Sequence, residues 1–143
     1  MILGLAVSLP FSANGEAEPT GDPLAMISGH WAFQSETYDG CNFGGTAYFA
    51  PDEHEGELRC ELTARQTCIA YEWVVRQSCT ARLSDNRLVV ESEIEEFLVG
   101  EPSPSYWPDN FILKIRSSER MTGVLVSHGS HPTEFVRQTP GVS

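Results

Sequence analysis

Apolar and polar residues alternate along most of the chain from Gly29 onward, with the period of two that is typical of β-strands with one buried face. In the first such segment, Trp31 and Phe33 alternate with Ala32 and Gln34. The pattern predicts eight strands, over residues 31–35, 45–49, 58–65, 75–83, 88–95, 111–116, 121–127 and 134–137. After Gly29 the sequence shows no convincing helical stripe, although residues 91–99 could be mistaken for one.

Segments rich in turn-forming residues separate the predicted strands, at 51–56, 84–86, 100–105, 117–119 and 128–132. Short strands with short connections are compatible with a barrel or a β-sandwich, and the sequential hairpins favour the barrel. We therefore predict an all-β fold, an eight-stranded antiparallel up-and-down β-barrel. The interior of such a barrel is filled by side chains or holds one small ligand. Filling by Trp31, Phe33, Phe111 and Phe135 would count against the ligand-binding hypothesis as a whole.

The four cysteines of the chain add covalent constraints to this barrel. An even number in a small exported protein predicts two disulfides; zinc is the alternative, but the chain contains no Cys-x-x-Cys. A turn near Ile69 and Ala70 places Cys60 opposite Cys79, since paired residues of an antiparallel hairpin have a constant index sum. A turn at residues 53–55 brings Cys41 near Cys68. We predict the pairs Cys60–Cys79 and Cys41–Cys68, and hence a disulfide-stapled barrel.

The first 26 residues differ from the rest of the chain. Residues 2–11 are apolar and are followed by small residues, as in part of a secretory signal that lacks its basic start. Residues 16–23 have the composition of a disordered acidic linker. We therefore expect a signal-like segment and linker over residues 1–26, a barrel domain over 27–143, and a secreted or periplasmic location. The apolar run is too short to span a bilayer, so no membrane insertion is expected.

The excess of acidic over basic residues restricts the classes of partner that we expect. With 9 basic and 20 acidic residues, the formal net charge is −11. Such a charge repels phosphate backbones and anionic lipid surfaces, so nucleic-acid binding is not expected. Solubility explains the charge, and a basic partner is compatible with it.

Several side chains are candidates for a ligand site. Aromatic residues near strand ends could line the rim of the barrel, namely Tyr71, Trp73, Tyr106 and Trp107. The alternative, which the pattern favours, is that they cap the ends of the core. Gln77 and Ser92 are polar at inward positions, where a satisfied buried network and a ligand contact are both reasonable.

Metal binding and catalysis find little support in the sequence. His128 and His131 belong to a predicted loop, and residues 52–55 form a charged turn that could hold a metal only weakly. Ser130 lies beside His131 without a Gly-x-Ser-x-Gly setting. We expect no metal, no cofactor and no enzymatic activity.

The segment Gly29-His30-Trp31, at the start of the first strand, and Arg137, in the last strand, resemble the lipocalin-like calycin β-barrels. The resemblance implies that Trp31 closes the barrel floor and that Arg137 packs across its indole, a favourable cation–π geometry. Gly29 would let the chain turn closely into this base. The same pattern resembles the small bacterial metalloprotease inhibitors of the Inh type, which insert an N-terminal segment into the protease cleft. In this chain, the inserted N-terminal segment would be residues 16–28.

These observations favour an exported β-barrel that binds a small apolar or amphipathic ligand. The alternatives are an Inh-type inhibitor whose partner is a protease, and an envelope interaction module without a ligand.

Overall fold

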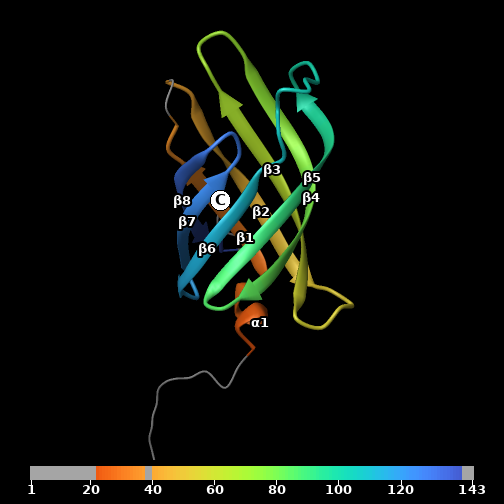
Figure 1. Ribbon diagram of the computed structural model, residues 1–143, viewed down its shortest axis with the longest axis vertical. Helices are drawn as coiled ribbons and strands as arrows, with labels where there is room; N and C mark the ends of the chain where they lie inside the picture. Colours follow the sequence, from red (N-terminus) through yellow and green to blue (C-terminus); the bar gives the residue numbers. More distant parts are fainter. Residues whose placement is uncertain (1–21, 38–39, 140–143) are drawn as a thin grey trace, which may run out of the picture.

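The computed structural model describes residues 22–37 and 40–139, which form a closed barrel of eight antiparallel strands (Figure 1). The strands are β1 (Gly29–Ser35), β2 (Asn42–Pro51), β3 (Glu57–Thr67), β4 (Glu72–Ser84), β5 (Arg87–Val99), β6 (Asn110–Ser117), β7 (Arg120–Val126) and β8 (Ser130–Arg137). Each strand pairs with the next one in sequence, and β1 also pairs with β8, with Phe33 opposite Phe135. The predicted up-and-down barrel is confirmed, and the sandwich is excluded.

The predicted alternation of inward and outward side chains is also confirmed. In β3, for example, Leu58, Cys60, Leu62 and Ala64 are buried, whereas Arg59 and Glu61 between them are exposed. Residues 91–99 continue β5 and form no helix. The alternation holds because each barrel strand has one face toward the core and one toward solvent.

Aromatic side chains fill the interior of the barrel. Phe33, Phe111 and Phe135 pack on one another with ring centroids 5.0–5.3 Å apart. Together with Trp31 they are at most 4% exposed. The filling that was expected to count against ligand binding is therefore observed, and it excludes a ligand held in this part of the barrel, because these side chains already occupy the space.

Both predicted disulfides are present. Cys60 and Cys79 are direct partners in the β3–β4 ladder, at the register expected from the sequence. Cys41 and Cys68 join the segments that precede β2 and follow β3. Two disulfides in a small domain are typical of oxidising compartments.

A short helix that the sequence did not suggest, α1 (Pro23–Ile27), covers one end of the barrel (Figure 1). Its N-cap Asp22 accepts a hydrogen bond from the backbone N–H of Leu24 at 3.0 Å. Leu24 and Ile27 belong to the same buried cluster as the strand residues, so the packed unit begins ahead of Ile27. Among the described residues, no helix is both long and apolar enough to cross a membrane.

Gly29, Trp31 and Arg137 meet at this end, which we call the base. The Trp31 indole donates to the carbonyl of Ile27 at 2.8 Å, and the Arg137 guanidinium lies 4.5 Å from the indole centroid. Arg137 also donates to the carbonyls of Ser28 and Ser118, at 2.8 and 2.7 Å. Gly29 has a φ of +117°, and a Cβ there would lie 2.9 Å from Arg137 Nη1. The base therefore has the Trp–Arg arrangement that the resemblance implied.

Candidate functional site

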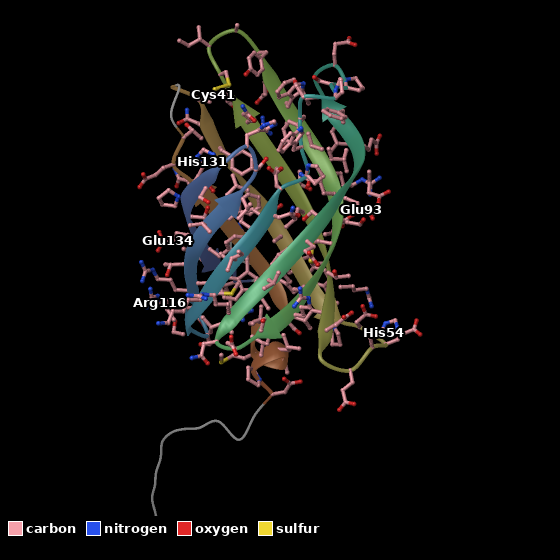
Figure 2. The ribbon with its side chains drawn as sticks, in the orientation of Figure 1. Cys41, His54, Glu93, Arg116, His131 and Glu134 are labelled. Carbon is pink, nitrogen blue, oxygen red and sulfur yellow. A yellow bond between two sulfur atoms is a disulfide. The ribbon has the colours of Figure 1, made fainter. Side chains whose placement is uncertain are left out.

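The opposite end of the barrel, which we call the mouth, is built differently. It carries the β1–β2, β3–β4, β5–β6 and β7–β8 connections, and the longest of these that the structure describes in full, residues 100–109, joins β5 to β6. Figure 2 shows Cys41 and His131 toward this end, and His54 toward the base. The site that we describe lies among these connections.

All four predicted rim aromatics lie together at the mouth. Ring centroids are 4.8 Å apart between Tyr71 and Trp73, and 5.4 Å apart between Trp73 and Tyr106. Trp107 stacks on His128 at 3.8 Å. Tyr71 is 45% and Trp107 52% exposed, whereas Tyr106 is buried. The structure thus groups these residues, and their role as ligand contacts stays a prediction.

The β5–β6 connection is held against this aromatic cluster. The Trp73 indole donates to the carbonyl of Glu101 at 2.9 Å, and His128 Nε2 donates to the carbonyl of Ser105 at 2.8 Å. Gly100 has a φ of +91°, and a Cβ there would come within 2.4 Å of the Trp73 ring. Glycine is therefore needed for the connection to pass so close to Trp73.

A buried polar network lies beneath the aromatic cluster. The Gln77 side-chain amide donates to Asp109 Oδ2 at 2.7 Å and accepts from the Asp109 backbone N–H at 2.9 Å. The Tyr106 hydroxyl donates to the same Oδ2 at 2.6 Å. Gln77 is fully buried and Asp109 only 2% exposed. Gln77 is thus the network residue that its inward polar position suggested, while Ser92 is not part of this network.

Burial governs the protonation of both acidic groups in the network. It raises the pKa of Asp109 to about 6, and the hydrogen bonds from Tyr106 and Gln77 and the nearby His128 lower it only in part. Burial, the charge of Asp109 and the hydrogen bond to it raise the pKa of Tyr106 above its usual value. Asp109 can therefore change its charge near neutral pH, whereas Tyr106 stays a hydrogen-bond donor.

Two adjoining cavities open at the mouth, with Gln66, Asp109, Ser127 and His128 in the walls of both. One, of about 290 Å³, is also lined by Phe43, Leu125 and His131. The other, of about 180 Å³, is lined by all four rim aromatics. We call the two together the mouth cleft. These volumes fall at or below the small end of the range for ligand pockets.

A larger hollow of about 710 Å³ lies on the outer surface near the β1–β8 seam. Gln34, Arg120 and Glu134, all exposed, line it. Arg120 and Glu134 form an ion pair with each other. Its walls also include the buried Ser35 and Thr133, whose hydroxyl groups bond to each other at 2.6 Å. None of the described residues that line it is aromatic, whereas the mouth cleft has aromatic walls.

One further cluster has metal-ligating side chains. Potential ligand atoms of Asp52, His54 and Glu57 lie within 4.8 Å of one another, near the β2–β3 turn. His54 is exposed there, as expected for a charged turn. At the mouth, His128 and His131 both line the larger cavity, but His128 already donates through Nε2 to Ser105.

The N-terminal segment bears on the protease-inhibitor alternative. Of residues 16–28, residues 22–28 are described; the rest of that segment and the signal-like stretch lie outside the described residues. Leu24 and Ile27 are 5% and 1% exposed, and Arg137 donates to the carbonyls of Met26 and Ser28. This part of the segment is built into the base, and the protease-inhibitor alternative stays a prediction.

The sequence did not single out Asp109 or Gln66 as parts of a site. Asp109 contacts Gln77 across 32 positions of the chain, and only the barrel closure brings them together. The available signal was that Asp109 directly follows Trp107 and Pro108 and precedes a strand.

Comparison with known proteins identifies the fold. No family model matches the chain, and no curated protein matches its sequence. Solved structures that are similar include a de novo designed fluorescence-activating β-barrel, with a TM-score of 0.59 and 17% identity, over 83% of this chain and 100% of that one. A redesigned barrel, mFAP1, bound to DFHBI, has a TM-score of 0.58 and 16% identity, over 80% and 97%. Identities this low show the fold alone, a closed eight-stranded antiparallel β-barrel.

Proposed function

We propose that this protein binds a small amphipathic or aromatic ligand in the mouth cleft, and that it acts by binding and not by catalysis. The observation that carries the proposal is the arrangement of Tyr71, Trp73, Tyr106 and Trp107 around a cavity whose inner wall holds Asp109. Aromatic walls with a few fixed polar groups are the usual composition of a ligand site.

The energetics favour the mouth over the interior. A ligand in the filled part of the barrel would have to displace packed rings, whereas a ligand in the cleft covers aromatic surface that is already exposed. Each 100 Å² of apolar surface removed from water contributes roughly 2.5 kcal/mol. Tyr71 and Trp107, about half exposed, offer such surface. Ile69, Leu98 and Val99 are also exposed and extend the apolar rim.

The polar network supports binding without a reaction. Gln77 and Tyr106 hold the Asp109 carboxyl in place, which is the geometry of a fixed recognition group. The raised pKa of Tyr106 makes its hydroxyl a poor proton donor in catalysis but a durable hydrogen-bond donor.

The similar barrels add support of a general kind, since mFAP1 is a barrel of this fold with a small molecule, DFHBI, bound. Membership of the calycin superfamily and export to a secreted or periplasmic location also belong to this proposal. They are supported by the Trp31–Arg137 contact and by the two disulfides respectively.

Indole N–H signals provide a direct test, because the chain has three tryptophans and they lie at opposite ends of the barrel. The ¹⁵N-labelled full chain is titrated with small aromatic probes, including the neutral 2-(2-naphthyl)ethanol. We expect the indole signals of Trp73 and Trp107 to shift and that of Trp31, buried in the base, to stay. Probes that bind but shift only other signals, or a panel in which no probe binds, would overturn the proposal.

A further inference from the structure

The side chains that donate hydrogen bonds to the Asp109 carboxyl group are neutral. Gln77 and Tyr106 both donate to Oδ2, at 2.7 and 2.6 Å, and neither carries a positive charge. A carboxylate offers about four acceptor positions, so two donors do not saturate it. Burial of an ion without a counter-charge is costly, and a cation placed beside it recovers part of that cost.

The groups that face Asp109 come from several elements. Gln77 lies on β4, Tyr106 on the β5–β6 connection and His128 on the β7–β8 connection, and the cavity walls add Gln66 from β3 and His131 from β8. Among the described residues that line the two cavities, none is a lysine or an arginine. The histidines are therefore the sources of positive charge in the walls, and only when protonated.

The aromatic walls favour the same kind of ligand. Tyr71, Trp73 and Trp107 line the smaller cavity together with Asp109, and the faces of such rings attract cations. The net charge of −11 adds a long-range attraction for cations and repels anions.

We propose that the mouth cleft selects small organic cations, protonated amines that carry an apolar or aromatic group, with Asp109 as their counter-ion. This inference rests on the proposed function and names its ligand class. The ammonium group lies beside the Asp109 carboxylate, and the apolar group lies against Trp73 and Trp107. The cavities, of about 180 and 290 Å³, limit the ligand to a small one.

A matched series of probes tests the charge preference. The amine 2-(2-naphthyl)ethylamine, the neutral 2-(2-naphthyl)ethanol and the anionic 2-naphthylacetate share one ring system and differ in charge. Isothermal titration of the full chain at pH 7.5 should give an amine affinity at least about tenfold above that of the alcohol, the lower end of what a hydrogen bond to a charged group contributes. The acetate should bind more weakly than the alcohol.

The variant Asp109→Asn tests whether Asp109 causes the preference for the amine. The amide keeps the shape and the acceptor oxygen but removes the charge, so the amine should lose its advantage, and the alcohol should bind within about threefold of its original affinity. Glu93→Gln is the matched control, since Glu93 is exposed on the outer face of β5 (Figure 2), and this variant should keep the amine preference.

The outcomes separate the two proposals. Equal affinities across the series overturn cation selection and leave mouth binding intact, whereas failure of the whole series to bind overturns both. An amine advantage that survives in Asp109→Asn overturns the role of Asp109.

Should that variant not fold, a pH series on the unaltered protein tests the role of Asp109 instead. Burial raises the pKa of Asp109 to about 6, so the amine preference should shrink several-fold from pH 7.5 to 5. An unchanged preference would overturn the inference.

Discussion

The base and the mouth are two ends of one barrel, and their polar groups have different partners. At the base, Trp31 and Arg137 direct their N–H groups to backbone carbonyls, and the apolar side chains of α1 cover the opening. At the mouth, Gln77 and Tyr106 donate to the side chain of Asp109, and the aromatic rings above stay partly exposed. The base is therefore built for closure, whereas the mouth has buried polar groups and apolar surface that closure does not require.

Replacement of one tryptophan at each end gives the largest contrast. Trp31→Ala removes a fully buried ring, and we expect a loss of about 3–5 kcal/mol in the free energy of unfolding. Trp107→Ala removes a ring that is 52% exposed, and we expect about 1 kcal/mol or less. Urea denaturation measures both, and similar losses at the two ends would contradict the assignment of the base as the closing element.

The two disulfides sharpen the same contrast. Cys60 and Cys79 are 19 positions apart and Cys41 and Cys68 are 27 apart, so removal of either pair by double alanine substitution should cost about 3 kcal/mol through chain entropy. The effects on binding should differ. Cys68 donates its backbone N–H to the carbonyl of Tyr71, so loss of Cys41–Cys68 loosens the mouth and should weaken the naphthyl probes. Loss of Cys60–Cys79 should leave probe affinity within about twofold, and equal weakening would argue against local control of the mouth.

The two ends also differ in how far the sequence predicts them. The strands and the Cys60–Cys79 register follow from alternation and index sums, because a one-residue slip would turn every buried side chain outward. The Trp31–Arg137 contact is predicted by the resemblance to known barrels. Its physical basis is the attraction between the face of an indole and a guanidinium cation. The rim aromatics were recognised as a set because they lie at predicted strand ends.

The Gln77–Asp109 pair and helix α1 were not predictable by the same means. Asp109 is the last residue of the β5–β6 connection, where no periodicity marks it as buried, and its partner is fixed only when β4 and β6 take their places in the closed barrel. Helix α1 has five residues, too few for a helical stripe, and it is stabilised by burial of Leu24 and Ile27 in the core cluster of the barrel.

The charge of Asp109 should give the mouth a measurable pH dependence. Burial raises its pKa from 3.8 to about 6 in the folded chain, so the folded state holds the extra proton between these values. The free energy of unfolding should therefore fall as the pH rises from about 4 to 6 and then level off, by at most about 3 kcal/mol from this group. Other carboxyl groups contribute as well, so the measurement is the difference between the unaltered chain and Asp109→Asn across that range. A pH-independent difference would refute the assignment, and Glu93→Gln should show no such slope.

The smallest expected effect concerns how well the β5–β6 connection is ordered in the absence of a ligand. Trp73→Phe keeps a ring beside Tyr106 but removes the hydrogen bond from the Trp73 indole to the carbonyl of Glu101. Because that bond is exposed, we expect a loss of only about 0.5–1 kcal/mol in stability. Amide exchange in residues 100–109 should nevertheless become faster, and the naphthyl probes should bind a few-fold more weakly, since a looser connection must be ordered on binding. Glu93→Gln is again the control, because Glu93 is exposed on the outer face of β5. Faster exchange without weaker binding would mean that the β5–β6 connection covers the cleft but does not preorganise it.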